Sequence, residues 1–128
     1  MNCLDTNALI DYLDGDEAIG SFLEEHDTVP YFAPAIVLHE VFVGAARRDG
    51  RAGVERVQED LDWVEPLSLS IDAAAEAALI KAELLDQGTR IGAMDTLIAG
   101  AVRDVGGTLV TADSHFTEVT DLDIELYR

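Results

Sequence analysis

The chain has 128 residues, of which 26 are acidic and 8 are basic, so its formal net charge is −18. Hydrophobic residues make up 48% of it, too many for a disordered chain. No apolar run approaches the ~18 residues that a membrane-spanning helix needs, so we expect no membrane association. The opening MNCLDTNALI has no basic segment before a long apolar run, which predicts a cytoplasmic protein without a secretory signal. The length predicts a single domain over residues 1–128.

The acidic excess is the unusual feature of the composition. Only one basic residue, Lys81, is a lysine, and this depletion is typical of proteins from salt-loving organisms, where salt screens self-repulsion. The alternative is an ordinary acidic protein that binds a basic partner. The single cysteine, Cys3, excludes an internal disulfide and fits buried packing.

In the first half of the chain, short apolar runs alternate with helical patterns. We expect a strand over 2–4, helices over 6–13 and 16–26, a strand over 28–33 and a helix over 35–47. Asp16 would cap the second of these helices, and Pro34 fits the first turn of the third. Pro30 favours a strand start or an edge strand.

The second half continues the alternation. It predicts helices over 51–64, 71–88 and 94–105, an extended segment over 65–70, and strands over 108–113 and 123–127. Gly88 and the pair Gly106-Gly107 would end two of the helices. Short apolar strands separated by helices predict an α/β fold with a largely parallel sheet.

Four acidic residues stand in or next to apolar runs, where an unpaired carboxylate is costly. Asp5 and Asp113 each follow an apolar strand, and ligands of open parallel sheets bind at the carboxyl ends of strands. Glu40 and Asp95 lie in the helical runs IVLHEVFVGA and AMDTLIAGAV, and Asp95 shares its helical stripe with Ile98 and therefore faces inward. If the two strands are neighbours, the four carboxylates meet at one crevice.

Four neighbouring acids without a basic partner would repel one another, and their pKa values would rise. A bound divalent cation removes this conflict. Sites made of carboxylate oxygens suit Mg²⁺ or Mn²⁺, which typically also bind a phosphate-containing substrate. The pattern therefore predicts a metal site for phosphate chemistry.

Each acid also has a purely structural interpretation. Asp5 can cap the helix that follows it, Asp95 can cap a helix over 96–105, and Asp113 can be a turn residue before Ser114. Glu40 has no such role, because it lies in the middle of a helix among valines.

Four segments occur in a fixed order along the chain: LDTNALID, LHEVFVGA, RIGAMDTLIAGAV and LVTADSHF. Together they resemble the motifs of PIN-domain ribonucleases, in particular the VapC-type toxins of toxin–antitoxin pairs, over nearly the whole chain. The resemblance implies a PIN-like three-layer α/β/α fold with a central, mostly parallel sheet. It also implies that the catalytic, metal-binding acids are Asp5, Glu40, Asp95 and Asp113. Asn7 and Thr111 would support the site; otherwise they are a helix-start residue and a strand-end hydroxyl.

The resemblance implies an Mg²⁺- or Mn²⁺-dependent endoribonuclease that acts as the toxin of a VapBC-type pair. It further implies a homodimer, an RNA substrate and a small VapB-like antitoxin that blocks the acidic crevice. The acidic surface departs from the basic one that RNA binding favours. Arg47, Arg48, Arg51 and Arg56 follow the glutamate helix and could flank an RNA groove; they could equally be a solvated helix end.

Three other functions remain open at this stage. The chain could be a PIN nuclease of RNA processing, or a PIN-like domain that binds RNA or a partner without cleaving. A receiver-type phosphoacceptor domain fits poorly, because Asp5 is followed by Thr6-Asn7 rather than a second acid and the only lysine, Lys81, lies inside a helix. The histidines, His26, His39 and His115, are scattered, and we expect them to be structural.

Overall fold

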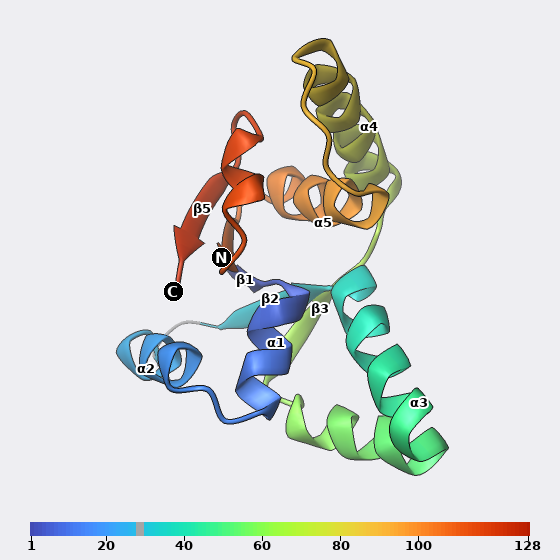
Figure 1. Ribbon diagram of the computed structural model, residues 1–128, viewed down its shortest axis with the longest axis vertical. Coiled ribbons are helices and arrows are strands. Elements are labelled where there is room, and N and C mark those ends of the chain that lie inside the picture. The colour runs from blue at the N-terminus through green and yellow to red at the C-terminus, as the bar shows by residue number, and fades with distance from the viewer. Residues whose placement is uncertain (28–29) are drawn as a thin grey trace.

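The computed structural model describes residues 1–27 and 30–128 and contains a five-stranded parallel sheet of order β3-β2-β1-β4-β5 (Figure 1). The strands are β1 (Asn2–Leu4), β2 (Tyr31–Pro34), β3 (Val64–Leu67), β4 (Thr108–Thr111) and β5 (Asp123–Leu126). The helices are α1 (Thr6–Leu13), α2 (Glu17–Glu25), α3 (Ala35–Asp60), α4 (Ile71–Asp86) and α5 (Ala93–Asp104), and a 3₁₀ helix, η1 (Ser114–Glu118), follows β4.

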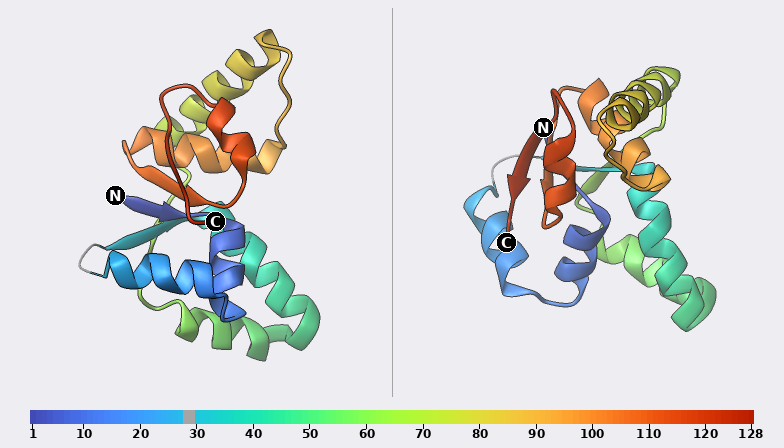
Figure 2. Two further views of the ribbon diagram at one scale, coloured as in Figure 1. Left: turned by 60° about the vertical axis from the view of Figure 1, so that its left-hand side comes forward. Right: turned by 45° about the horizontal axis from the view of Figure 1, so that its top comes forward.

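Helices cover both faces of the sheet. In Figures 1 and 2, α1, α2 and α3 lie on one side of the strands, and α4, α5 and η1 lie on the other. The predicted three-layer α/β/α fold with a parallel sheet is thereby confirmed. In chain order, β2 and β3 extend the sheet from one edge of β1, and β4 and β5 then extend it from the other edge.

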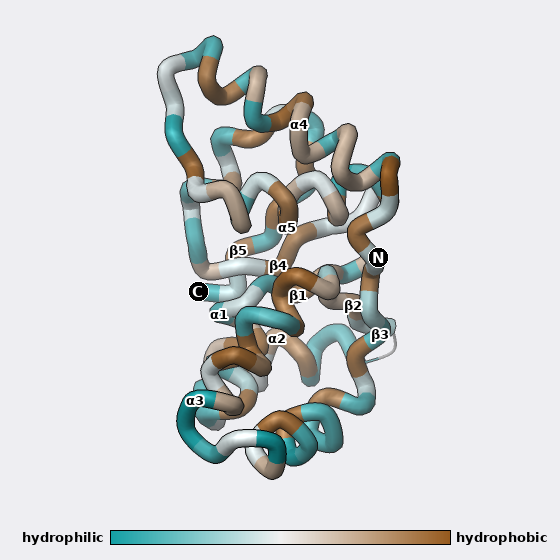
Figure 3. Tube along the Cα trace, turned by 90° about the vertical axis from the view of Figure 1, so that its right-hand side faces the viewer, coloured by the Kyte–Doolittle hydropathy of each residue, from teal (hydrophilic) through white to brown (hydrophobic). Residues whose placement is uncertain are grey.

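The central strands form the core of the molecule. Cys3, Leu4, Leu109 and Val110 are fully buried, and β1 pairs with β4 over its whole length. Figure 3 shows the hydrophobic residues concentrated at β1 and β4, whereas the far end of α3 is hydrophilic. Burial raises the pKa of the Cys3 thiol to about 11, so this residue packs as an apolar side chain, as expected.

Caps fix where the first helices begin. The side chains of Asp5 and Asp16 accept hydrogen bonds from backbone N–H groups in the first turns of α1 and α2, as the sequence predicts. On the other face, α4 packs closely on α5, because Gly100 lets the backbone of Ala77 approach it. A Cβ at position 100 would lie 2.6 Å from the Ala77 nitrogen.

The third helix differs from the sequence prediction. The two helices predicted over 35–47 and 51–64 are both present within the element α3, which breaks between them at Gly50, where φ is 62° and ψ is −147°; only the end of the second helix differs. The helix ends at Asp60, and Val64 begins β3 instead of ending a helix. Val64 is buried because it pairs in register with Tyr31, so its burial belongs to the sheet and not to a helix face.

Smaller differences concern element ends. The strand predicted over 28–33 is β2, Tyr31–Pro34, and residues 28–29 lie outside the described residues. Pro34 closes this strand and forms the N-cap of α3, so its placement in the first helical turn was wrong. The strand predicted over 108–113 ends at Thr111, which leaves Asp113 beyond it. Within the described ranges, no helix is long and apolar enough to cross a membrane.

Candidate functional site: a cavity lined by four carboxylates

The four predicted acids line one cavity of about 210 Å³, at the carboxyl ends of β1 and β4. This is where the strand order reverses, because β2 lies on one side of β1 and β4 on the other. The starts of α1, α3 and α5 approach one another here (Figure 1). The lining residues are Asp5, Thr6, Asn7, Glu40, Asp95, Ile98, Asp113 and Phe116, and none of them is basic.

Asp5 is the buried member of the group. Its Oδ1 accepts from the backbone N–H of Ala8 at 2.9 Å, and its Oδ2 accepts from the hydroxyl of Thr111. The pKa of Asp5 is raised from its ordinary 3.8 to about 6: burial raises it most, the hydrogen bonds from Thr111 and Ala8 lower it, and the charges of Asp113 and Asp95 raise it. The predicted capping role is therefore correct, and the same carboxylate also faces the cavity.

Glu40 reaches the cavity from the second turn of α3. Its Oε1 accepts a hydrogen bond of 2.8 Å from the hydroxyl of Thr6, which is the first residue of α1. His39, its neighbour, is exposed and does not line the cavity. Since the side chain of Glu40 serves no helix cap, this polar contact is what holds it at the cavity.

Asp95 lies in the first turn of α5, and Gly92 is the N-cap of that helix, so a capping role for Asp95 over 96–105 was wrong. Burial raises the pKa of Asp95, and the charges of Asp113 and Glu40 raise it too, while His115 lowers it. The dipole of α5 favours a negative charge at this end of the helix. The carboxylate of Asp95 is thus half-buried, has acids as neighbours, and is favoured by the helix dipole.

Asp113 is the N-cap of η1, and its side chain is partly exposed. Its Oδ1 accepts from the backbone N–H of His115 at 2.9 Å, and the ring Nδ1 of His115 lies 3.0 Å from the same oxygen. The backbone N–H of Asp113 donates to the hydroxyl oxygen of Thr111 at 2.9 Å. The turn role predicted for Asp113 is correct, and it places the side chain at the cavity.

Two of the residues around the acids were predicted as supports, and two were not. Thr111 is fully buried and connects Asp5 with Asp113, and Asn7 lines the cavity with an exposed side chain. Thr6 and His115 were missed as partners of acids. Thr6 stands directly after Asp5, but only the fold shows that its partner lies 34 residues away.

The arginines after Glu40 follow the helix away from the cavity. Arg48 lines a small hollow of about 90 Å³ that shares Glu40 with the carboxylate cavity. Arg47 and Arg51 are exposed on either side of the Gly50 kink, and Arg56 lies 3.6 Å from Asp49. Of these four side chains, Arg48 is the one that lines a hollow shared with an acid of the carboxylate cavity.

The donor set of the cavity fits a hard divalent cation. Its four carboxylates offer oxygen ligands, and without a cationic side chain in the lining their charges are not neutralised. In the described part of the chain, however, no three His, Cys, Asp or Glu side chains are grouped ready to hold an ion. Asp5, Glu40 and Asp113 are each turned toward protein donors instead.

The family model described as "PIN domain" matches residues 3–122. The chain belongs to the PIN-domain family. No curated protein sequence matches this PIN domain, but many solved structures share its fold.

Three similar structures are VapBC complexes. The VapBC2 complex of Rickettsia felis bound to a promoter DNA fragment has 22% identity and a TM-score of 0.90, covering 99% of this chain and 98% of the matched one. DNA-bound VapBC of Salmonella typhimurium has 25% identity and a TM-score of 0.87, with the same coverage. VapBC-1 of nontypeable Haemophilus influenzae has 21% identity and a TM-score of 0.84, covering 98% and 97%. These likenesses confirm the PIN-like fold that the sequence motifs predict.

Proposed function

We propose that this PIN domain is a metal-dependent endoribonuclease and the toxin of a VapBC-type pair. The observation that carries the proposal is the convergence of Asp5, Glu40, Asp95 and Asp113 on one cavity without a basic residue. Membership of the PIN family and the likeness to VapBC complexes support it. The chain would act as a homodimer on RNA in the cytoplasm.

In this proposal the four carboxylates hold Mg²⁺ or Mn²⁺, and Asn7 and Thr111 support them. When bound, the ion would activate a water and stabilise the leaving oxygen during hydrolysis of an RNA phosphodiester. Glu40 and Asp113 are partly exposed, so their side chains can turn from their protein donors toward the cavity. The carboxylate of Asp5 is held by hydrogen bonds from Thr111 and Ala8, so its position should not change when the ion binds.

The rest of the chain orients these groups and shapes the access to them. The hydroxyl of Thr6 keeps Glu40 on the cavity side of α3. Ile98 and Phe116 form the apolar part of the lining and limit water around the acids. Arg48 lines the hollow that it shares with Glu40, and its charge there would attract the phosphate backbone; Arg47 and Arg51 would extend this contact.

The proposed partner is a small VapB-like antitoxin. The similar structures are VapBC complexes, and the acidic cavity suits a cationic segment of such a partner. An arginine would be the natural plug, because a guanidinium pairs with carboxylates in two-pronged geometry. The product of a small reading frame next to this gene should therefore copurify with the chain and suppress its activity.

The direct test is RNA cleavage with Mn²⁺ or Mg²⁺ by the purified chain and by Asp95→Asn and Glu40→Gln. Both variants should lose cleavage, and their thermal midpoints should equal or exceed that of the unmodified chain, because charge repulsion in the cavity is relieved. Asp104→Asn, at the exposed opposite end of α5, is the matched control and should cleave normally. Full activity of Asp95→Asn, or cleavage that persists in EDTA, would contradict the proposal.

A further inference from the structure

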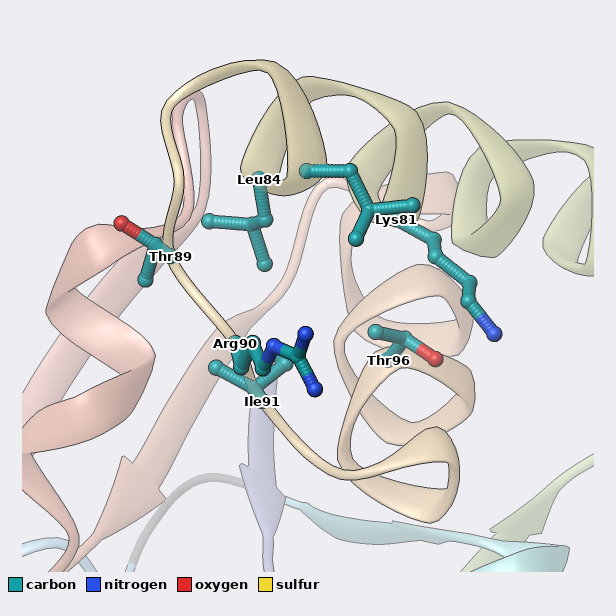
Figure 4. Close-up of a pocket in the computed structure, with 7 residues that line it drawn as sticks. Lys81, Leu84, Thr89, Arg90, Ile91 and Thr96 are labelled. Atoms are coloured by element: carbon teal, nitrogen blue, oxygen red, sulfur yellow. The ribbon is translucent and has the colours of Figure 1, made fainter.

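A second cavity, of about 290 Å³, lies between the end of α4, the segment 87–92 and α5 (Figure 4). Its lining combines two cationic side chains, two hydroxyls and an apolar wall: Lys81, Leu84, Leu85, Thr89, Arg90, Ile91 and Thr96. In Figure 4 the guanidinium of Arg90 and the amine of Lys81 lie on either side of Thr96. The second cavity therefore offers positive charge and hydrogen-bonding groups next to the apolar side chains of Leu84, Leu85 and Ile91.

The charge of this cavity is exceptional for this chain. Only 8 of 128 residues are basic against 26 acidic ones, yet two of the 8 line the same hollow. Among the residues described, neither Lys81 nor Arg90 has an acidic partner within 4.0 Å. Two like charges in one hollow repel each other unless an anion joins them.

The acids of α4 are directed elsewhere. Arg103 of α5 binds Glu76 at 3.2 Å and Glu83 at 3.4 Å, so Glu83, two residues from Lys81, is engaged by a different cation. No acid stands three or four residues from Lys81 on α4, so its own helix offers it no ion pair. This leaves the cationic groups of the second cavity free for a ligand.

The second cavity adjoins the carboxylate cavity. Thr96 of the second cavity directly follows Asp95 of the first, and consecutive residues on a helix point about 100° apart. The two hollows therefore open on neighbouring faces of the first turn of α5. Beyond Lys81 and Thr96, a further hollow of about 220 Å³ continues between α4 and α5 along small alanine side chains.

We propose that the cavity of Lys81 and Arg90 is a phosphate-binding subsite for the RNA strand whose scissile bond lies in the carboxylate cavity. The inference rests on the proposed function and assigns to these residues the next phosphate contact along the strand. Lys81 and Arg90 contact phosphate oxygens, and Leu84 and Ile91 pack against the sugar or base. The contacts select a nucleic-acid backbone and no particular base.

The test is binding of a fluorescein-labelled, mixed-sequence single-stranded RNA to the full chain in EDTA, measured by fluorescence anisotropy over a series of KCl concentrations. Lys81→Gln and Arg90→Gln should each weaken binding roughly threefold to tenfold. The plot of log K against log [KCl] should become shallower by about 0.7 for each variant, and by about 1.4 for both together. Arg56→Gln removes the same charge from an exposed ion pair on α3 and should change neither quantity.

The outcomes separate this inference from the proposed function. Equal binding and equal salt slopes for Lys81→Gln, Arg90→Gln and Arg56→Gln would overturn the subsite, even if the chain cleaves RNA. The expected losses in a chain that fails to cleave would support the subsite and contradict the proposed nuclease. If inorganic phosphate shifts the amide resonances of Thr96 and Ile91 while RNA binding is unchanged in the variants, the subsite takes free phosphate and the RNA assignment is wrong. Since Lys81 and Arg90 are exposed, thermal midpoints should stay unchanged and exclude misfolding.

Discussion

The hydroxyl of Thr111 at the end of β4 donates a hydrogen bond to the carboxylate of Asp5 at the end of β1, 106 residues away along the chain. The same hydroxyl oxygen accepts from the backbone N–H of Asp113 at 2.9 Å. One fully buried threonine therefore sets the position of two acids of the cavity. It also connects the two strands between which the sheet reverses its order.

We expect Thr111→Val to lower the free energy of unfolding at pH 7 by about 2 kcal/mol, because a buried carboxylate loses a donor. Asp5 should then titrate at a still higher pH, and the loss should shrink in acid, where its carboxyl is protonated. Thr111→Ser keeps the hydroxyl and should restore most of the stability. Thr108→Val, on the same strand, is the control, since Thr108 makes no side-chain hydrogen bond within the described residues. Urea unfolding that treats Thr111→Val and Thr108→Val alike would refute this role.

The raised pKa of Asp5 predicts how stability depends on pH. The folded-state value of about 6 lies above the ordinary 3.8, so the folded chain holds this proton more tightly than the unfolded chain. The unmodified chain, free of metal, should therefore lose stability as the pH rises from about 4 through about 6, by about 3 kcal/mol from this group alone. Asp5→Asn should lack this loss, so its stability relative to the unmodified chain should be greatest at pH 7. Urea unfolding in EDTA over this pH range measures the difference, with Asp16→Asn as a control for changing a capping carboxylate.

Gly100 allows α4 and α5 to pack closely, and Gly100→Ala should destabilise the chain by about 2 kcal/mol or more. The added Cβ would lie 2.6 Å from both the nitrogen and the Cβ of Ala77, so backbone would have to move. Gly20→Ala in α2 meets nothing within 4 Å and should instead stabilise the chain by about 0.5–1 kcal/mol. Chemical unfolding of both variants checks the pair, and equal effects would contradict the packing argument.

The net charge of −18 predicts that salt stabilises the chain. Self-repulsion should be screened over about 10 Å at ~0.1 M KCl and over about 3 Å at ~1 M, while short-range contacts between carboxylates and bound ions are screened far less. The thermal midpoint should rise between low and molar KCl, and cleavage at fixed Mn²⁺ should at least be maintained. A fall of both with salt would refute the halophilic interpretation and favour a basic partner as the reason for the acidic surface.

Much of the fold and the cavity could be predicted because their signals are local. Asp5 and Asp113 follow apolar strands, and Glu40 and Asp95 interrupt apolar helical runs, so each acid is conspicuous in its own segment. The alternation of strands and helices likewise predicts the parallel sheet. Val64 was misplaced because a buried valine fits a helix face and a strand equally well, and pairing with Tyr31 decides between them only in three dimensions.

Contacts between distant segments left no such signal. Tyr127 and Arg128 both donate to the carboxylate of Asp11 on α1, and Arg128 Nη2 lies 3.0 Å from it. This contact joins the residues after β5 to α1, across 116 residues of sequence. In the sequence Asp11 is an ordinary helical acid, Tyr127 is the last residue of the strand predicted over 123–127, and Arg128 follows it. The contact depends on the pairing of β4 with β5, which a local pattern does not reveal.

The central position of β1 has a consequence for protein synthesis. Asp5 leaves the ribosome first, but β4, which pairs with β1 and carries Thr111, is made only after more than a hundred further residues. Until that segment emerges, a growing chain has β1 without its second neighbour and holds Asp5 without Thr111 or Asp113. The cavity is thus complete only once β4 and the segment after it have been made. A chain that stops before β4 lacks both Thr111 and Asp113 and should have no complete carboxylate site.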